Sequence, residues 1–378
     1  MLRLLLPIVL LFVTGCESLG YYSQLAEGQW SIWWQRQAID KLLNDSSVEP
    51  ALRARLQKVQ LIRQYAVDAL SLPDNNSYKY FADVKRPFVV WNVFAAEEFS
   101  VEAKRWCFPV AGCVSYRGYF THKAARDYAD SLAAQGYDTY VAGIRAYSTL
   151  GWFGDPVLNT FVYQDEARLA GLIFHELAHQ ILYLPGDTEF NESFATAVEL
   201  AGLKRWLQHN EVFRVDADDI NSSSDSRKIT DTGRITEKYL RKQAIHRDFV
   251  KMILVARKQL DTLYRQKTSG DFDMTVVREE KHNIIQQLVG DEYVDFKAKW
   301  GNYEGYDRWF YDSRTTPAAI NNAKLSTVYS YQKWVPSFQS ILTSCDGDLP
   351  CFYAEAKKLS LLNDAQRLQR LQDFSPSL

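Results

Sequence analysis

The chain has 378 residues, with 44 Lys and Arg against 46 Asp and Glu, so its formal net charge is −2. Apolar residues make up 47% of the chain, which at this low net charge excludes a largely disordered protein. The balanced charge excludes the strongly basic composition that is typical of nucleic-acid binding, and we expect no nucleic-acid partner. Five cysteines are present, an odd number that cannot all pair.

The N-terminus combines Arg3 with an apolar run from Leu4 to Val13. A transmembrane helix needs about 20 residues, whereas this shorter run is typical of a signal peptide. The run ends in Val13-Thr14-Gly15-Cys16, which resembles the lipobox of bacterial lipoproteins. We therefore expect residues 1–15 to be removed and Cys16 to carry a lipid; an ordinary secretory signal is the alternative. Glu17 favours the outer membrane, with the protein facing the periplasm.

The other four cysteines form two close pairs, Cys107 with Cys113 and Cys345 with Cys351. An exported chain meets an oxidising compartment, where short-range pairs of this kind form disulfides. Pro109 and Gly112 lie within the first pair and suit a tight turn. We therefore expect two local disulfides, with free thiols as the alternative.

The periodicity of the apolar residues gives the order of elements after the leader. Residues 16–30 are expected to form a lipidated tether, followed by a single domain over 31–378. Helices are expected over 33–69, 123–135, 163–183, 190–207, 236–266, 273–300, 320–342 and 353–370. Strands are expected over 87–94, 114–120 and 137–142, and loops over 143–160 and 216–233. This order predicts a mainly helical α+β chain, in which a small early sheet precedes a helical C-terminal half.

The motif His175-Glu176-Leu177-Ala178-His179 (HExxH) lies in a segment whose apolar residues have helical spacing. His175 and His179 are one turn apart and therefore share a face of the helix. Two imidazoles so placed can bind one Zn²⁺. Glu176 is rotated by about 100° from His175 and can reach a water instead. Histidines placed there only for packing are the alternative, although buried polar groups without partners are costly.

A catalytic zinc needs a third protein ligand and an open position for water. Glu192 begins the next predicted helix, and a turn at Pro185-Gly186 would fold that helix back onto the first. We expect Glu192 to be the third ligand, with Glu189 as its rival. Glu199, two turns further along, is expected to hydrogen-bond a ligand imidazole.

Several segments carry a resemblance to known proteins. Asn191-Glu192 resembles the ligand motif of the gluzincin metallopeptidases. The chain as a whole resembles the family of bacterial predicted aminopeptidases in the lipobox and in residues 106–120, 146–156, 175–180 and 190–196. The resemblance implies a zincin-like fold that binds zinc through His175, His179 and Glu192. It also implies Glu176 as the catalytic acid and base.

We therefore predict a zinc-dependent peptidase, and specifically an aminopeptidase, that acts on peptides in the bacterial cell envelope and contacts the membrane through its lipid. The alternatives are an endopeptidase with the same site and a non-catalytic lipoprotein that docks a partner. The chain lacks a G-A-M-E-N-type amine-recognition motif, which leaves the first alternative open.

Two further roles have several candidates each. The tyrosines that can stabilise an oxyanion are Tyr147, Tyr183, Tyr329 and Tyr331, and the acids that can hold a free α-amine are Asp187, Glu189 and Glu199. The strand at 137–142 is expected to be a core strand; binding of the peptide backbone at a sheet edge is the alternative.

Overall fold

A computed structural model describes the backbone of residues 2–109, 111–151, 153–221, 229–267, 273–311 and 320–375. Side chains are described over the same ranges except residues 2–18, 211–221, 229–236 and 267. The side chain of Cys16, the expected lipidation site, therefore lies outside the described residues.

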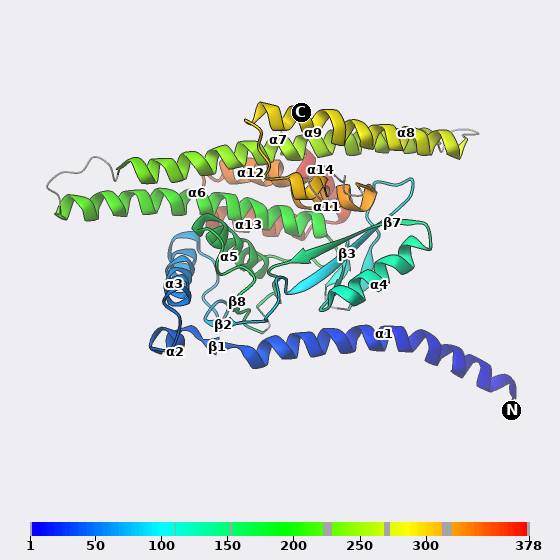
Figure 1. Cartoon of the computed structure of the whole chain (residues 1–378), viewed down its shortest axis with the longest axis horizontal. Coiled ribbons are helices and arrows are strands. Elements are labelled where there is room, and N and C mark those ends of the chain that lie inside the picture. The colour runs from blue at the N-terminus through cyan, green and yellow to red at the C-terminus, as the bar shows by residue number, and fades with distance from the viewer. Residues whose placement is uncertain are drawn as a thin grey trace.

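Helices dominate the described chain (Figure 1). They are α1 (Leu2–Gln35), α2 (Ile39–Leu43), α3 (Pro50–Leu70), α4 (His122–Ala133), α5 (Glu166–Ile181), α6 (Thr188–Asn221), α7 (Ile229–Lys267), α8 (Met274–Gln287), the π-helix η1 (Leu288–Glu292), α9 (Tyr293–Lys299), α10 (Asp307–Phe310), α11 (Asn322–Gln332), α12 (Val335–Ser344), α13 (Leu349–Ser360) and α14 (Asp364–Asp373).

Among the described residues, the strands are short and all lie in the first half of the chain. They are β1 (Gln37–Ala38), β2 (Tyr80–Ala82), β3 (Val90–Glu97), β4 (Trp106–Phe108), β5 (Gly112–Val114), β6 (Arg117–Tyr119), β7 (Tyr137–Ile144) and β8 (Val157–Leu158). Within the described residues they form sheets of order β1-β2-β8, β6-β3-β7 and β4-β5. The chain is therefore mainly helical α+β with small sheets, as its sequence predicts.

The sheet β6-β3-β7 is covered on both faces. Successive side chains of a strand point to opposite faces, and in β3 both sets are buried. Val93 and Ala95 belong to a cluster with residues of α4, whereas Phe94 and Ala96 cluster with Ala323 of α11. β7 pairs with β3 along its whole length and forms one edge of this sheet.

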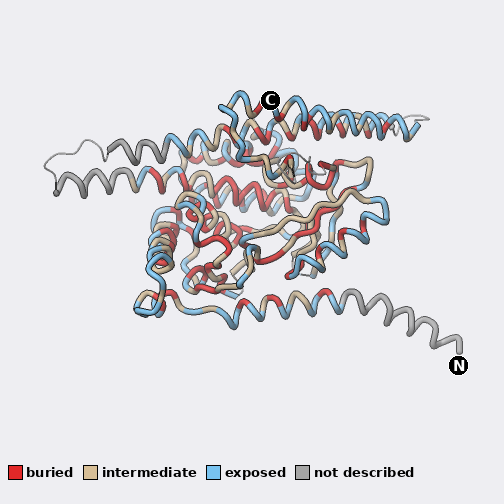
Figure 2. The backbone as a smooth tube through the Cα atoms, viewed as in Figure 1, coloured by how far each residue is buried: buried red, intermediate tan, exposed pale blue. Residues whose placement is uncertain are grey.

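The main hydrophobic core surrounds α5 and α6, which lie against each other in antiparallel directions. Phe174 on α5 and Phe194 on α6 are fully buried in it, together with side chains of α3, α12 and α13. Figure 2 shows the buried backbone concentrated in these central helices and strands. A second cluster joins α7, α8 and α9 in a separate helical layer, on the opposite side of the molecule from α1 (Figure 1).

The N-terminal residues enter the fold as a helix. Residues 16–30, which were expected to form a tether, lie within α1. Tyr21 and Ile32 on its inner face are buried against the body of the protein. In the part of the chain whose side chains are described, no helix combines the length and the apolar character that crossing a bilayer requires.

Both expected disulfides, Cys107–Cys113 and Cys345–Cys351, are present. The first closes the β4-β5 hairpin, which lies against the turn between α5 and α6. Gly186 N donates to Ala111 O at 3.1 Å, and Tyr183 Oη donates to the same oxygen at 3.1 Å. Gly112 has a positive φ of 72°, and a Cβ there would lie 2.4 Å from Gly186 N. Glycine is therefore required where these two backbones meet.

Several expected boundaries were wrong. The helix expected over 33–69 is divided into α1, α2 and α3. Pro50, which lacks an N–H, suits the first turn of α3. The helix expected over 320–342 is divided between α11 and α12, where Pro336 is again in the first turn. The strand expected over 114–120 is divided between β5 and β6.

Two other expectations concern long helical segments. The helix expected over 273–300 changes to a π-helix at η1. In the loop expected over 216–233, both flanks are helical, because polar residues without proline are compatible with a helix. Residues 222–228 lie outside the described residues.

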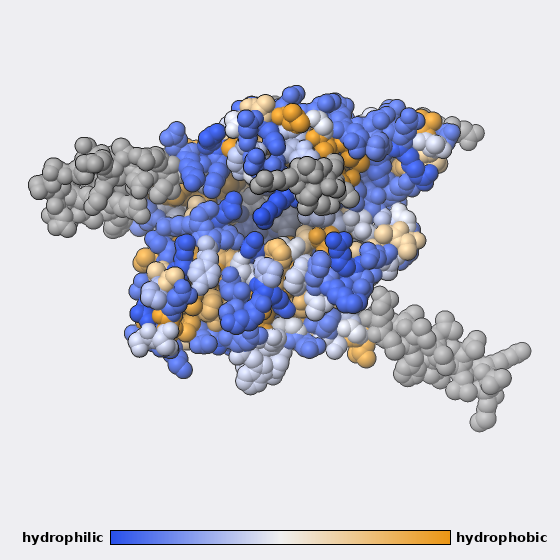
Figure 3. Space-filling model, viewed as in Figure 1, coloured by the Kyte–Doolittle hydropathy of each residue, from blue (hydrophilic) through white to orange (hydrophobic). Residues whose placement is uncertain are grey.

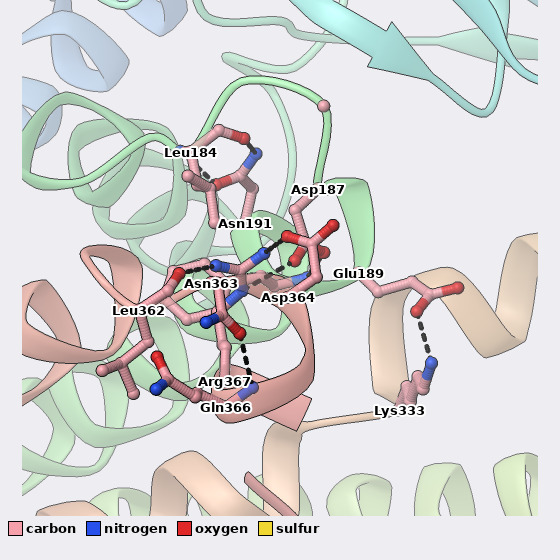
Figure 4. A network of polar contacts seen from close by, with 12 residues as sticks. Leu184, Asp187, Glu189, Asn191, Lys333, Leu362, Asn363, Asp364, Gln366 and Arg367 are labelled. Atoms are coloured by element: carbon pink, nitrogen blue, oxygen red, sulfur yellow. Dashed lines mark hydrogen bonds and ion pairs between the residues drawn. The ribbon is translucent and has the colours of Figure 1, made fainter. Parts of the chain in front are cut away.

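The turn between α5 and α6 is held by side chains (Figure 4). Asn191, on the first turn of α6, accepts from Leu184 N at 2.7 Å and donates to Leu184 O at 2.8 Å. Asp187 accepts from Phe190 N at 3.0 Å and is paired with Arg367 of α14 at 3.2 Å. These contacts set the direction in which α6 leaves the turn.

Replacing Asn191 with Ala should destabilise the protein by about 2 to 3 kcal/mol, because it leaves both backbone groups of Leu184 without their partner. Chemical denaturation measures this change. Asn44→Ala is the matched control, since exposed Asn44 makes one bond to Asp40 O and its loss should cost well under 1 kcal/mol. Equal effects of the two substitutions would contradict this account of the turn.

Candidate metal centre

The histidines of the HExxH motif are presented by a helix with clear sequence signals. Asp165 is the N-cap of α5, and its side chain accepts a hydrogen bond from Arg168 N at 3.0 Å. Apolar residues then bury the helix against α3 and α6. His175 and His179 lie on the side of α5 that faces α6, with their ring centroids 4.9 Å apart.

The antiparallel course of α6 brings Glu192 to the two imidazoles. Its Oε2 lies 3.3 Å from Nε2 of His175 and 3.7 Å from Nε2 of His179. One ligand atom from each of the three residues lies within 4.8 Å of the others. Among the described residues, this is a group that can hold a metal ion. Glu192 and His179 are each only 8% exposed.

Glu199 binds the ring nitrogen of His175 on the side away from Glu192. Its Oε2 lies 3.1 Å from Nδ1 of His175, the ring nitrogen that does not face Glu192. Gly171 on α5 provides the space, since a Cβ there would lie 3.0 Å from Glu199 Oε1. A carboxylate that binds Nδ1 leaves Nε2 free to coordinate a metal. Nδ1 of His179 is buried without a hydrogen-bond partner in the described structure. The imidazole of His179 therefore contacts Glu192 through Nε2.

The charges of the group depend on one another. Burial acts to lower the pKa of His175, but hydrogen bonds to Glu192 and Glu199 raise it well above its usual range. Burial acts to raise the pKa of Glu192, whereas His179 and His175 lower it to about 2. The carboxylate is thus ionised and buried between two rings. Such a charge needs compensation by a cation, which either imidazolium or a metal can provide.

Glu176 follows His175 on α5, and its carboxyl group lies close enough to His175 and His179 to interact with their charges. It also lies near a loop at 74–78 that the sequence did not indicate as part of the site. Burial raises the pKa of its carboxyl group. Gln180, one turn further along the same face, accepts from Asn75 Nδ2 at 2.6 Å and donates to Ser77 Oγ at 3.1 Å. Tyr78 follows in this loop, and its pKa is raised by burial and by the negative charge of Glu176.

The loop at 74–78 is bound by Arg63 of α3. Buried Arg63 donates to Ser77 O at 3.0 Å, to Asn75 O at 2.7 Å and to Asp74 Oδ1 at 2.5 Å. Tyr78 itself has a φ of 63°, which is rare for an aromatic residue. The surrounding contacts therefore impose an unfavourable backbone conformation next to Glu176. The spacing of Glu176 and Gln180 by four residues was the sequence signal for a shared face.

Of the four candidate tyrosines, Tyr331 on α11 is the one most strongly affected by the metal group. The charge of Glu192 is the largest cause that raises its pKa well above the usual range. Tyr116, between β5 and β6, was missed from the sequence; burial and the charge of Glu192 raise its pKa as well. Tyr183 is affected less directly, because burial is the main cause and its hydroxyl also donates to Ala111 O.

The other two tyrosines are engaged elsewhere. Tyr147 donates to Gln29 of α1. The guanidinium of Arg257 lies 3.6 Å from the ring centre of Tyr329. Neither contact brings a hydroxyl to Glu192.

The acidic candidates are likewise placed by their partners. Glu189, the rival third ligand, is paired with Lys333 at 2.6 Å and lies outside the metal group (Figure 4). Asp187 is paired with Arg367, and Glu199 with His175. All three carboxylates therefore already have a cationic or imidazole partner.

Comparison with known proteins shows a family relationship. The model of the family described as "Putative aminopeptidase" matches residues 20–371 of the chain, which is most of its length. Comparison with curated proteins and with solved structures gave no match.

The geometry predicts which carboxylate binds metal. His175→Ala or Glu192→Ala should abolish binding of one zinc ion, because each removes a ligand from a group of three. Glu199→Gln should weaken binding about 10- to 100-fold by loosening His175. Competition with a chromogenic chelator measures these affinities.

Glu189→Gln is the matched control, since this carboxylate is paired with Lys333, and zinc affinity should be unchanged. Loss of zinc from Glu189→Gln, with retention by Glu192→Ala, would reverse the assignment.

Proposed function

The chain belongs to this aminopeptidase family, and from that premise we propose that it is a zinc-dependent aminopeptidase with a zincin-like site. The observation that carries the proposal is the convergence of His175, His179 and Glu192 on one point, beside the buried carboxyl group of Glu176. The family supplies the class of reaction, and these residues supply the chemistry.

The donor set fits zinc. Two imidazole nitrogens and one carboxylate oxygen are the ligands of catalytic zinc sites, which keep a further position open. Calcium and magnesium prefer sites built from oxygen atoms alone. Glu199 on His175 Nδ1 supplies the carboxylate–histidine contact that orients such ligands. A bound cation would also compensate the buried charge of Glu192.

The residues around the ligands have separate roles in the proposed reaction. Zinc, when bound, polarises a carbonyl oxygen and lowers the pKa of water. The carboxylate of Glu176 accepts a proton from the attacking water and passes it to the nitrogen of the leaving amine. Tyr331 donates its hydroxyl proton in a hydrogen bond to the oxyanion that forms on the substrate carbonyl. The Asn75–Gln180–Ser77 contacts hold the loop beside Glu176 in place.

The edge of β7 is the proposed binding site for the peptide backbone. The carbonyl of Ile144 accepts from Val89 N, on the side of β3. Backbone groups alternate in direction along an antiparallel strand, so those of Val141 and Gly143 point away from β3. An extended peptide can pair with them as an added strand. Figure 1 shows this end of β7 directed toward α5.

One observation favours an endopeptidase as the second candidate. An aminopeptidase needs a carboxylate for the free α-amine of its substrate, and Asp187, Glu189 and Glu199 are each paired with another side chain. A site that binds only the peptide backbone and the metal does not require such an amine.

The proposed location follows from the disulfides and the leader. Disulfides persist in oxidising compartments outside the cytoplasm. We assign residues 1–15 to a lipoprotein signal peptide and Cys16 to lipid attachment, with the protein facing the periplasm from the outer membrane.

Glu176→Gln should abolish peptide hydrolysis while one zinc ion stays bound, because the amide cannot accept the proton of the attacking water. Tyr331→Phe should keep zinc and lose only part of kcat. Elemental analysis and hydrolysis of a peptide mixture give the two readouts. Glu166→Gln, in the first turn of α5, is the matched control and should keep full activity. Retained hydrolysis in Glu176→Gln would contradict the proposed mechanism.

Peptides with free and with acetylated N-termini should distinguish the two specificities. The proposed aminopeptidase should release single residues from free N-termini and leave acetylated peptides intact, as mass spectrometry of the products reveals. Internal cleavage of both sets at equal rates would instead establish the endopeptidase.

A further inference from the structure

The outward face of α1 is rich in exposed aromatic side chains. Trp30, Trp33 and Trp34 are 59%, 37% and 66% exposed. Their rings contact one another, with centroids 5.5 to 5.7 Å apart. Leu19 and Tyr22 continue the same face toward the N-terminus, and both are also exposed. We call these five residues the aromatic face.

The aromatic face is separated from the face that holds α1 to the protein. Tyr21, Gly28 and Ile32 are buried, and they fall on one side of the helix at the spacing of helical turns. A Cβ at Gly28 would overlap the ring of Phe120, so the helix lies close to the body there. Figure 2 shows this alternation of buried and exposed backbone along α1. The aromatic residues are thus not needed to dock the helix.

Trp33, the second of the three tryptophans, is in contact with the body of the protein. Arg36 lies 4.6 Å from the ring centre of Trp33 and 4.8 Å from that of Tyr80 on β2. Arg36 also donates to Phe153 O at 3.0 Å, and exposed Phe153 extends the apolar surface beyond the helix. In Figure 3, a group of pale side chains of intermediate hydropathy projects from the lower edge of the molecule, at this end of α1.

The chemistry of the face suits the boundary of a lipid bilayer. Tryptophan and tyrosine have an apolar ring and one polar group, and they concentrate where membrane meets water. From Leu19 to Gln35 the chain has a single charged residue, Glu27. The face also begins three residues after Cys16 of the lipobox, so a lipid there would hold it next to the membrane.

We propose that the aromatic face of α1 rests on the headgroup region of the bilayer and fixes the orientation of the lipid-anchored protein. The layer of α7 and α8, on the other side of the molecule from α1 (Figure 1), then faces away from the membrane. This inference rests on the anchor at Cys16 proposed above. It does not depend on the peptidase chemistry.

The test uses the lipidated protein in vesicles of phosphatidylethanolamine and phosphatidylglycerol, some with acyl chains brominated near the headgroup. Bromine should quench part of the tryptophan emission, at most the share of three of the ten tryptophans. Replacing Trp30, Trp33 and Trp34 together with Phe should remove the quenched part and keep the ring contacts. Trp300→Phe, in the distant layer, is the control and should leave the quenched part unchanged.

Two results would overturn the proposal. Quenching that survives the triple substitution would place other tryptophans at the membrane. Absent quenching, with a cross-linked dimer that the triple substitution removes, would assign the face to a second copy of the chain. Mass spectrometry of the intact N-terminus shows separately whether the lipid is attached. Zinc binding shows whether the variant is folded, and peptide hydrolysis tests the proposed function independently.

Discussion

One carboxylate oxygen of Glu192 lies between two imidazole nitrogens, 3.3 Å from His175 and 3.7 Å from His179, inside the protein. This contact requires one particular position of α6 along the axis of α5 and one particular rotation of α6 about its own axis. Asn191, the preceding residue, sets both by binding the backbone of Leu184 at the turn. The Cys107–Cys113 hairpin covers the same turn, and Gly171 allows Glu199 to approach. Much of the fold therefore serves this meeting of two helices.

The electrostatics of the site follow from the same contact. Glu192 and Glu199 together raise the pKa of His175, and Glu192 raises those of Tyr331 and Tyr116. Burying the negative charges of Glu192 and Glu199 so close together is costly for folding. A divalent cation at the three ligands would compensate them, so we expect zinc to stabilise the fold as well as to supply the chemistry.

The sequence predicted the parts of the site that are close together in the chain. A helix with an N-cap at Asp165, two histidines one turn apart and a turn at Pro185-Gly186 are local signals, and α5 is present at nearly the expected positions. The disulfides were predictable from the close spacing of each pair and from the expectation that the chain is exported. The choice between Glu192 and Glu189 depends on the rotation of α6 after the turn, which periodicity alone leaves open.

The remaining features depend on contacts between distant segments. The loop of Tyr78 is bound by Arg63 and Gln180, which are far apart in the chain. Tyr331 comes from a helix that follows long segments of α7 and α8. The helical packing of α1 was hidden because its buried residues are few and widely spaced. Such arrangements arise from tertiary packing, which a single sequence does not display.

The central claim is that His175, His179 and Glu192 hold one zinc ion. Anomalous diffraction from crystals of the zinc-loaded protein, recorded on both sides of the zinc absorption edge, tests it most directly. We expect one strong peak about 2.0 to 2.2 Å from Nε2 of both histidines and from a carboxylate oxygen of Glu192. A peak at Glu189 or elsewhere, with these three residues still in contact with one another, would contradict the account.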